Sequence, residues 1–261
     1  MHGKYYTTTI EPNLDVANGT AYTNKDLVFD WTPFEIPNGA GALVNTTIIY
    51  FGKDGAAAQA NDDLVLYFAK SNGATAPKSL GTVHAALTAT GVAPSRKNII
   101  GMTFIDQNQM VNNGNSLIGY DVLSNTGTGT NVIEGPMGVL LQGDPAYPST
   151  AGYQTIWVAG VGGTTSEFDF DSSVALNMAA SANVDADTTG ASVTLTTSGT
   201  DPRNVFAPGD IITGSTNTVT MEVVSVDSAT QMKVKNISAQ IDHAEILNPR
   251  NPIKMILGFE F

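Results

Sequence analysis

Short runs of apolar and β-branched residues, separated by polar turns, recur along most of the 261-residue chain. Clusters of Gly, Asn, Asp and Pro, such as those at 37–39 and 112–114, divide the runs and favour tight turns. Many short strands with frequent turns indicate an all-β chain, with a jelly-roll-like antiparallel β-sandwich as its main part. The predicted strands lie at 27–30, 43–51, 64–69, 99–105, 117–121, 138–141, 154–161, 167–170, 193–197, 210–213, 218–226, 231–235 and 253–261.

Helical periodicity is almost missing from the same pattern. Two Ala-rich runs, 55–60 and 83–89, have a possible 3.6-residue period, but both are short and have Gly or Pro close by. A mostly helical chain or an alternating α/β fold needs many longer periodic segments. The pattern therefore excludes both classes.

The region 185–236 alternates more regularly than the part before it. A sharp Pro208-Gly209-Asp210 turn leads into an apolar strand, and two further strands follow. Gly supplies a positive φ at such a corner, and we expect the Asp carboxylate to accept from the backbone amides that follow it. The region predicts a small five-strand β-barrel of SH3- or OB-like type, covering residues 183–246.

The last run, 253–261, is too apolar to lie uncovered, and it follows an extended Pro-rich link. We therefore expect it to return to the first sheet structure, which makes the barrel an insertion. The predicted sandwich then comprises 25–182 plus 247–261, and the polar stretch 1–24 is an extended N-terminal arm. A tandem arrangement of sandwich and barrel is the alternative.

Composition narrows the possible partners. Charged residues make up only 14% of the chain, the net charge is −12, and no Lys or Arg occurs between residues 98 and 202. Binding to nucleic acid requires clustered basic side chains, so neither nucleic acid nor an anionic membrane is an expected partner. The chain has no cysteine and no apolar run of about 18 residues. With no leader-like segment at its start, we expect synthesis in the cytoplasm.

The signatures of the common enzyme classes do not occur. The three histidines stand in unrelated contexts, no Gly-x-Ser-x-Gly nucleophile elbow occurs, and no phosphate-binding Gly-Lys-Ser/Thr sequence occurs. The sequence therefore predicts a protein that is not an enzyme, with no catalytic residue and no cofactor.

Acidic side chains give the strongest candidate for a metal site. Glu167, Asp169 and Asp171 alternate with two Phe, so on a strand the three carboxylates share one face. They could hold a divalent cation or form the carboxylate pair of a glycosidase, but a water-facing edge strand is the favoured interpretation. Residues 183–190 begin like an EF-hand loop, yet the required Gly and Glu are missing, which favours an Asx-rich linker.

Aromatic side chains give the strongest candidates for contacts with a partner. Tyr5, Tyr6 and Tyr22 lie within the predicted arm, where they could act as anchors. Trp31 stands at a strand end and is a further candidate, although a rim residue that closes the sandwich is the favoured interpretation. Trp157 lies inside an apolar run and is expected to pack in the core.

Four features of the chain are typical of one class of proteins: the Thr-, Asn- and Gly-rich strands, the sequence of residues 1–6, the barrel run and the apolar last run. In these features the chain resembles structural proteins of tailed bacteriophages. The barrel run Phe206-Ala207-Pro208-Gly209-Asp210-Ile211-Ile212 through Val234 is the nearest match. It is similar to small β-modules in virion proteins of phages that infect cyanobacteria. The resemblance is one of style over most of the chain, and no functional residue is carried over from it.

The resemblance implies a place in the virion. A major capsid protein of that class has a long spine helix, which no segment here supplies, so head decoration and tail-tube proteins remain. We expect a head decoration or cement protein on the capsid exterior, forming a homotrimer and binding the major capsid protein. A tail-tube subunit is the alternative within the class. A carbohydrate- or receptor-binding β-module is the alternative outside it.

Overall fold

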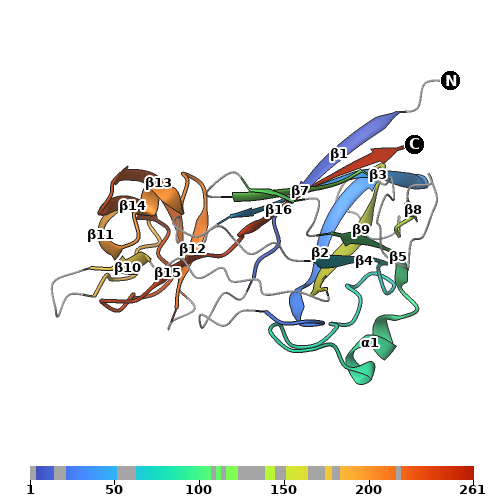
Figure 1. The fold of residues 1–261 in the computed structure, drawn as a ribbon, viewed down its shortest axis with the longest axis horizontal. Helices are drawn as coiled ribbons and strands as arrows, with labels where there is room; N and C mark the ends of the chain where they lie inside the picture. The colour runs from blue at the N-terminus through green and yellow to red at the C-terminus, as the bar shows by residue number, and fades with distance from the viewer. Residues whose placement is uncertain are drawn as a thin grey trace.

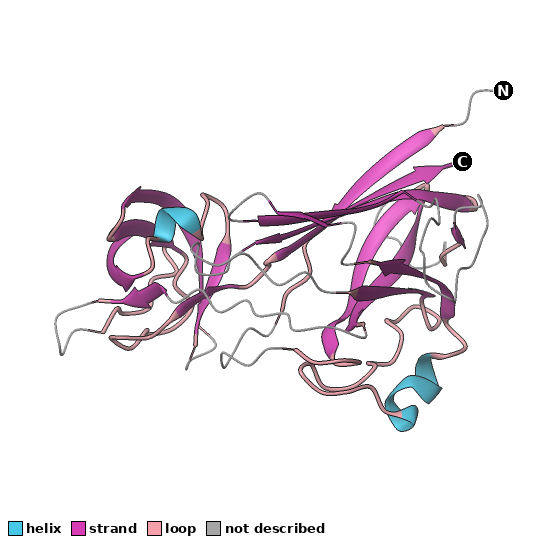
Figure 2. Ribbon diagram, viewed as in Figure 1, coloured by secondary structure: helices cyan, strands magenta, loops and turns pink. Residues whose placement is uncertain are grey.

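The protein is described here from a computed structural model, which covers residues 4–14, 22–51, 63–106, 110–112, 116–122, 139–144, 151–163, 174–177, 183–215 and 219–261. Almost all of this chain is strand and loop, as Figure 2 shows. Two β units lie side by side, a sandwich at the right of Figure 1 and a small barrel at the left. The prediction of an all-β chain that combines an antiparallel sandwich with a small barrel is confirmed.

Two antiparallel sheets form the sandwich. The first has the order β1 (Tyr5–Ile10), β16 (Ile253–Glu260), β3 (Gly41–Phe51), β7 (Ser116–Val122) and β6 (Met110–Asn112), with β8 (Val139–Leu141) paired to β3. The second has the order β2 (Leu27–Pro37), β9 (Tyr153–Gly162), β4 (Leu64–Lys70) and β5 (Ile99–Ile105). β16 therefore lies between β1 and β3, although in sequence it follows the whole barrel.

The main core fills the space between these two sheets. Along β16 buried and partly exposed residues alternate, because successive side chains of a strand point to opposite faces. The inward positions of β16 meet those of β2, β3 and β4 in one apolar cluster, which includes Phe34, Ile48, Leu66, Met255, Leu257 and Phe259. The terminal strand thus contributes directly to the centre of the sandwich.

The outer face of the four-stranded sheet is also covered. Residues 71–98, with the short helix α1 (Ala89–Ser95), cross this face and bury a second cluster around Leu80 and Ala159. The indole N–H of Trp31 donates to Lys78 O at 2.9 Å, and that of Trp157 donates to Ser71 Oγ at 3.1 Å. Burial on both faces explains why nearly every residue of β9 is buried.

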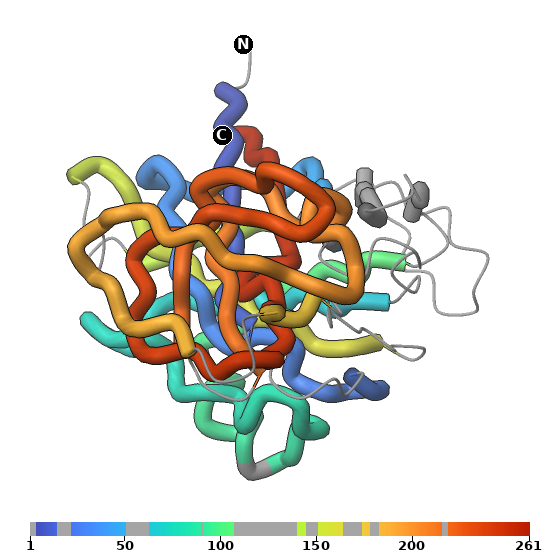
Figure 3. The backbone as a smooth tube through the Cα atoms, turned by 90° about the vertical axis from the view of Figure 1, so that its left-hand side faces the viewer, coloured from blue at the N-terminus to red at the C-terminus, as the bar shows by residue number. Residues whose placement is uncertain are grey.

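Six strands form the barrel, in the order β10 (Val174–Leu176), β11 (Val193–Gly199), β14 (Gln231–Lys235), β13 (Thr220–Ser228), β12 (Ile211–Gly214) and β15 (Leu247–Pro249). The edges β10 and β15 approach each other, because Ala175 bridges Ile246 and Leu176 N donates to Glu245 O at 2.8 Å. Figure 3 looks onto this nearly closed ring. The sheet has six strands where five were predicted: β11 to β14 lie within 183–246, and β10 and β15 lie just outside these bounds.

The turn at Pro208-Gly209-Asp210 has the backbone conformation that the sequence predicts. The hydrogen bond of its carboxylate differs from the predicted one. Gly209 has a φ of +97°, as the sequence predicts for this corner. The carboxylate Oδ2 of Asp210 accepts from Ala207 N at 2.7 Å, so it satisfies an amide before it and not after it. The turn thus closes on Ala207, which follows the short 3-10 helix η2 (Pro202–Asn204) in sequence.

Part of the predicted arm is a sheet strand. Within 1–24, residues 5–10 form β1, which is paired with β16 along its whole length. Ile10, Leu14 and Tyr22 are buried in the sandwich core. Over its described residues this segment is therefore an integral part of the sandwich and not a separate arm. The strand predicted at 167–170 lies outside the described residues.

Candidate functional site

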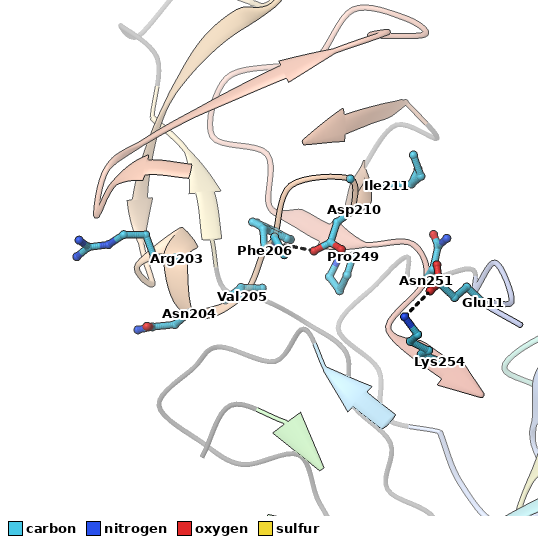
Figure 4. Close-up of a pocket in the computed structure, with 12 residues that line it drawn as sticks. Glu11, Arg203, Asn204, Val205, Phe206, Asp210, Ile211, Pro249, Asn251 and Lys254 are labelled. Carbon is cyan, nitrogen blue, oxygen red and sulfur yellow. Dashed lines mark hydrogen bonds and ion pairs between the residues drawn. The ribbon is translucent and has the colours of Figure 1, made fainter. Parts of the chain in front are cut away.

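A cleft of about 400 Å³ lies where the barrel meets the sandwich (Figure 4). One side comes from η2 and the turn before β12, and the other from the end of β1 and the start of β16. The link between the units is hydrogen-bonded to both, because Arg250 N donates to Ile211 O at 2.7 Å and Leu14 N donates to Arg250 O at 2.8 Å. The cleft is therefore a built junction between the two units.

Charges in the cleft are largely paired. Lys254 Nζ lies 3.4 Å from Glu11 Oε1, and Arg203 donates to both carboxylate oxygens of Asp201. Burial raises the pKa of Asp210, and the nearby Glu11 carboxylate raises it further, whereas the hydrogen bond from Ala207 N lowers it. The link through Arg250 bonds to both units beside these paired charges, so the arrangement fits a structural joint.

Asp210→Asn tests this joint through its pH dependence. The folded chain holds the Asp210 proton to higher pH than the unfolded chain, so this group lowers stability as the pH rises from 3.8 through its raised pKa. Asn removes the charge and keeps an oxygen acceptor for Ala207 N. We expect the variant to melt a few degrees above the parent at pH 7, and level with it near pH 3, in thermal scans followed by circular dichroism.

Asp201→Asn is the matched control for this comparison, with the opposite sign. The hydrogen bonds from Arg203 lower the pKa of Asp201, so its carboxylate adds stability that is lost as the pH falls through that lowered pKa. Asp201→Asn is therefore expected to melt below the parent at pH 7. An Asp210→Asn variant that also melts lower at pH 7 would contradict the burial argument.

The four predicted partner-binding aromatic residues have different surroundings. Tyr5 is 73% exposed near the tip of β1, where its hydroxyl donates to Glu260 Oε1 at 3.4 Å. Tyr6 is half-buried against Tyr153, with ring centroids 6.1 Å apart, and burial raises its pKa. Only Tyr5 presents most of its side chain to a partner.

Tyr22 and Trp31 are buried. Tyr22 is 1% exposed and stacks on His84 with ring centroids 3.7 Å apart, whereas Trp31 is 9% exposed beneath residues 71–98. Neither ring is available as a surface anchor or as a sugar platform. Trp157, which the sequence placed in the core, is buried as predicted.

The two acidic segments that the sequence singled out differ in what the structure describes. Glu167, Asp169 and Asp171 lie outside the described residues. In the 183–190 loop Asp187 Oδ1 accepts from Thr189 N at 2.8 Å and Gly190 has a φ of +84°, which is the geometry of an Asx-rich turn. Among the residues that the structure describes, no cluster of three or more His, Cys, Asp or Glu could hold a metal ion.

The outer face of β1 is a surface that the sequence analysis identified only at Tyr5. Tyr5, Thr7 and Thr9 are exposed along one side of the strand, while Ile10 is buried. The sequence Tyr-Tyr-Thr-Thr-Thr-Ile was the only local signal for a strand with one exposed side. This signal is weak because Thr is common on both faces of a strand. A second exposed pair, Met102 and Phe104, lies on the edge strand β5.

Comparison with known proteins assigns the chain to no family. No protein-family model matches it, and no curated protein matches it in sequence. None of the helices in the described part of the chain has the length and hydropathy needed to cross a bilayer.

Proposed function

We propose that the chain is a structural protein of a tailed-phage virion that decorates the capsid exterior and stabilises the assembled head. Its partner is the major capsid protein, and it acts as a homotrimer. The proposal rests on the resemblance of the sequence to virion proteins of this class. The all-β scaffold of antiparallel sheets supports the proposal, because decoration proteins of the jelly-roll kind are also built mainly of strands.

The observation that carries the binding role is the uncharged outer face of β1. Tyr5, Thr7 and Thr9 are exposed there, on a chain whose net charge is −12. Contacts through hydroxyl and aromatic groups avoid the cost of desolvating charges, and a Tyr is a common anchor in protein interfaces. Such a face suits repeated contact with a neighbouring subunit.

The proposed mechanism is multivalent binding. A trimer that touches several capsid subunits converts its second and third contacts into intramolecular ones. Weak single contacts then add to a strong attachment that holds adjacent subunits together. A substitution at one contact residue is present in every copy of the trimer. It therefore weakens all of the contacts, and its effect on attachment is multiplied.

Electron cryomicroscopy of purified particles tests the location. We expect density that fits the sandwich and barrel on the outside of the head. Density in the tail tube would replace this proposal with the alternative tail role. Particles that lack the chain altogether would overturn both.

Tyr5→Ala tests the surface. We expect its binding to heads prepared without this protein to weaken by about thirtyfold, the factor that corresponds to about 2 kcal/mol for an interface anchor. Met102→Ala removes an exposed apolar side chain from the other sheet and serves as the matched control. Binding is measured by co-sedimentation, and equal binding by the two variants would contradict the role of β1.

Removing residues 1–24 is not a suitable test. That deletion takes away the strand β1 and the buried side chains Ile10, Leu14 and Tyr22. The sandwich core would be opened, so a loss of binding would report unfolding. Substitution of an exposed side chain leaves the core intact.

A further inference from the structure

β1 lies at the edge of its sheet. Within the part of the chain that the structure describes, its only strand partner is β16. Lys4 and Phe261 exchange two backbone hydrogen bonds, Lys4 N to Phe261 O at 3.4 Å and Phe261 N to Lys4 O at 2.9 Å. Along an antiparallel ladder, pairs that exchange backbone hydrogen bonds alternate with pairs whose N–H and C=O groups point away from each other. Since Lys4 and Phe261 form a bonded pair, the N–H and C=O groups of Tyr5, Thr7 and Thr9 point away from β16.

This edge lacks the features that keep free edges apart. Natural proteins protect an exposed edge with Lys, Pro, a bulge or a covering segment. β1 contains no charged residue and no Pro, and its pairing with β16 has no register shift. Figures 1 and 3 both show the paired ends of β1 and β16 projecting from the body of the molecule, where a second strand can approach.

The charges around the edge favour a second copy of the same chain. A chain with a net charge of −12 repels its own copies over most of its surface, but β1 is neutral. Lys4 precedes the strand and Glu11 follows it. Antiparallel pairing of two β1 strands brings the Lys4 end of one copy to the Glu11 end of the other, whereas parallel pairing would place like charges together.

We propose that two copies associate through β1, which joins their six-stranded sheets into one continuous antiparallel sheet across a two-fold axis. Thr7 lies opposite Thr7 of the second copy, and Tyr5 lies opposite Thr9. This register pairs every outward backbone group of β1 and keeps Glu11, which is held by Lys254, outside the ladder. A shift by two residues in either direction leaves outward groups unpaired or draws Glu11 into the ladder.

The contact is separate from the proposed role on the capsid, because it forms between copies of the chain alone. It uses the backbone edge of β1, whereas capsid binding uses exposed side chains. A two-fold contact gives a dimer, or a hexamer if the chain also forms trimers. Sedimentation equilibrium over a range of concentrations measures which species is present.

Charge substitutions at Thr7 test the register. Thr7 is exposed, so Thr7→Lys and Thr7→Glu are expected to fold, while each places two like charges directly opposite each other on the axis. We expect the dissociation constant of the pair to rise about tenfold or more in each variant. An equimolar mixture of the two variants restores association, because Lys then faces Glu. Thr7→Val, which keeps the backbone donor, associates like the parent.

The absence of cysteine from the chain allows a second test. Opposed residues of a hydrogen-bonded pair have Cα atoms about 5.5 Å apart, within reach of a disulfide, so Thr7→Cys forms cross-linked dimers on mild oxidation. Thr9→Cys is the matched control. Thr9 is also exposed on the same face, but its counterpart lies four residues away along the strand, about 13 Å, and does not cross-link.

The two tests have clear contrary outcomes. A parent chain that is monomeric at every concentration, or an oligomer whose mass is unchanged in Thr7→Lys, overturns the proposal. Failure of the Lys and Glu variants to restore association when mixed, or equal cross-linking at positions 7 and 9, overturns the proposed register. Capsid attachment that persists in a chain without self-association leaves the proposed function intact.

Discussion

Replacing Phe259 with Ala lowers the free energy of unfolding of the sandwich by about 3–5 kcal/mol, the cost of deleting a buried aromatic ring. The ring is fully buried in β16, between β1 and β3. It lies 6.2 Å from the ring of Phe34 on the opposite sheet and 6.5 Å from that of Phe261. Ala at this position leaves a cavity where the two sheets meet, and the rigid strands on either side limit how far it can close.

Tryptophan fluorescence in urea measures this loss selectively. The chain has two Trp, in β2 and β9, and both belong to the sandwich. The signal therefore follows the sandwich while circular dichroism follows both units. Ile256→Ala is the matched control, because Ile256 is a partly exposed residue on the other face of the same strand. A Phe259→Ala variant no less stable than Ile256→Ala would refute the place of β16 in the core.

Replacing Trp157 with Ala is expected to cost about 3–5 kcal/mol as well, for a different reason. Its ring packs on the outer face of the four-stranded sheet, and its N–H holds Ser71 at the start of the segment that covers that face. Loss of the ring removes both the apolar contact and the anchor. The covering residues 71–98, with α1, then lose one of their anchors to the sheet, while the bond from Trp31 to Lys78 O remains.

Two milder variants separate packing from hydrogen bonding at this position. Trp157→Phe keeps most of the apolar contact and loses the bond to Ser71 Oγ, which is worth about 1 kcal/mol. Ser71→Ala leaves the buried indole N–H without its acceptor, at a cost of about 1–3 kcal/mol. Urea titrations followed by circular dichroism give the three values. A Trp157→Phe variant as unstable as Trp157→Ala would show that the hydrogen bond, and not the packing, dominates.

The sequence predicted the strands of the core well, because inward positions of a half-buried strand must be apolar. The runs at 64–69, 99–105 and 231–235 coincide with β4, β5 and β14 within a residue. β9 has no polar side chain from Ile156 to its end, and it is buried on both faces. Hydrophobic patterning was sufficient for the longer strands whose inward positions are all apolar.

The sequence could not predict the elements whose stability comes from distant partners. Half of the residues of β1 are Thr, and the sequence predicts an arm there, yet pairing with β16 makes it a strand. β10 and β15 each have three residues, too few for any periodic signal, and they become strands by closing the barrel. α1 contains Gly91 and Pro94, and it begins where Thr88 Oγ1 accepts from Gly91 N at 3.2 Å.

The candidate surface was predicted only in part, since exposure depends on what the rest of the chain covers. Tyr5, Tyr22 and Trp31 look alike as aromatic residues in polar surroundings. Tyr5 is exposed, whereas His84 covers Tyr22 and the 71–98 segment covers Trp31. These coverings join residues about 50 positions apart or more, which no local pattern records.

The position of β16 also sets an order of events during synthesis. Met255 pairs with Ile48, more than 200 residues earlier, and every strand of the barrel is translated between them. The barrel is therefore complete while the six-stranded sheet still has a gap between β1 and β3. Closing that gap is a late, non-local step of the kind that folds slowly and leaves apolar strands exposed. A nascent chain paused before residue 253 would consequently present an unfinished sandwich to chaperones, beside a barrel whose strands have all been made.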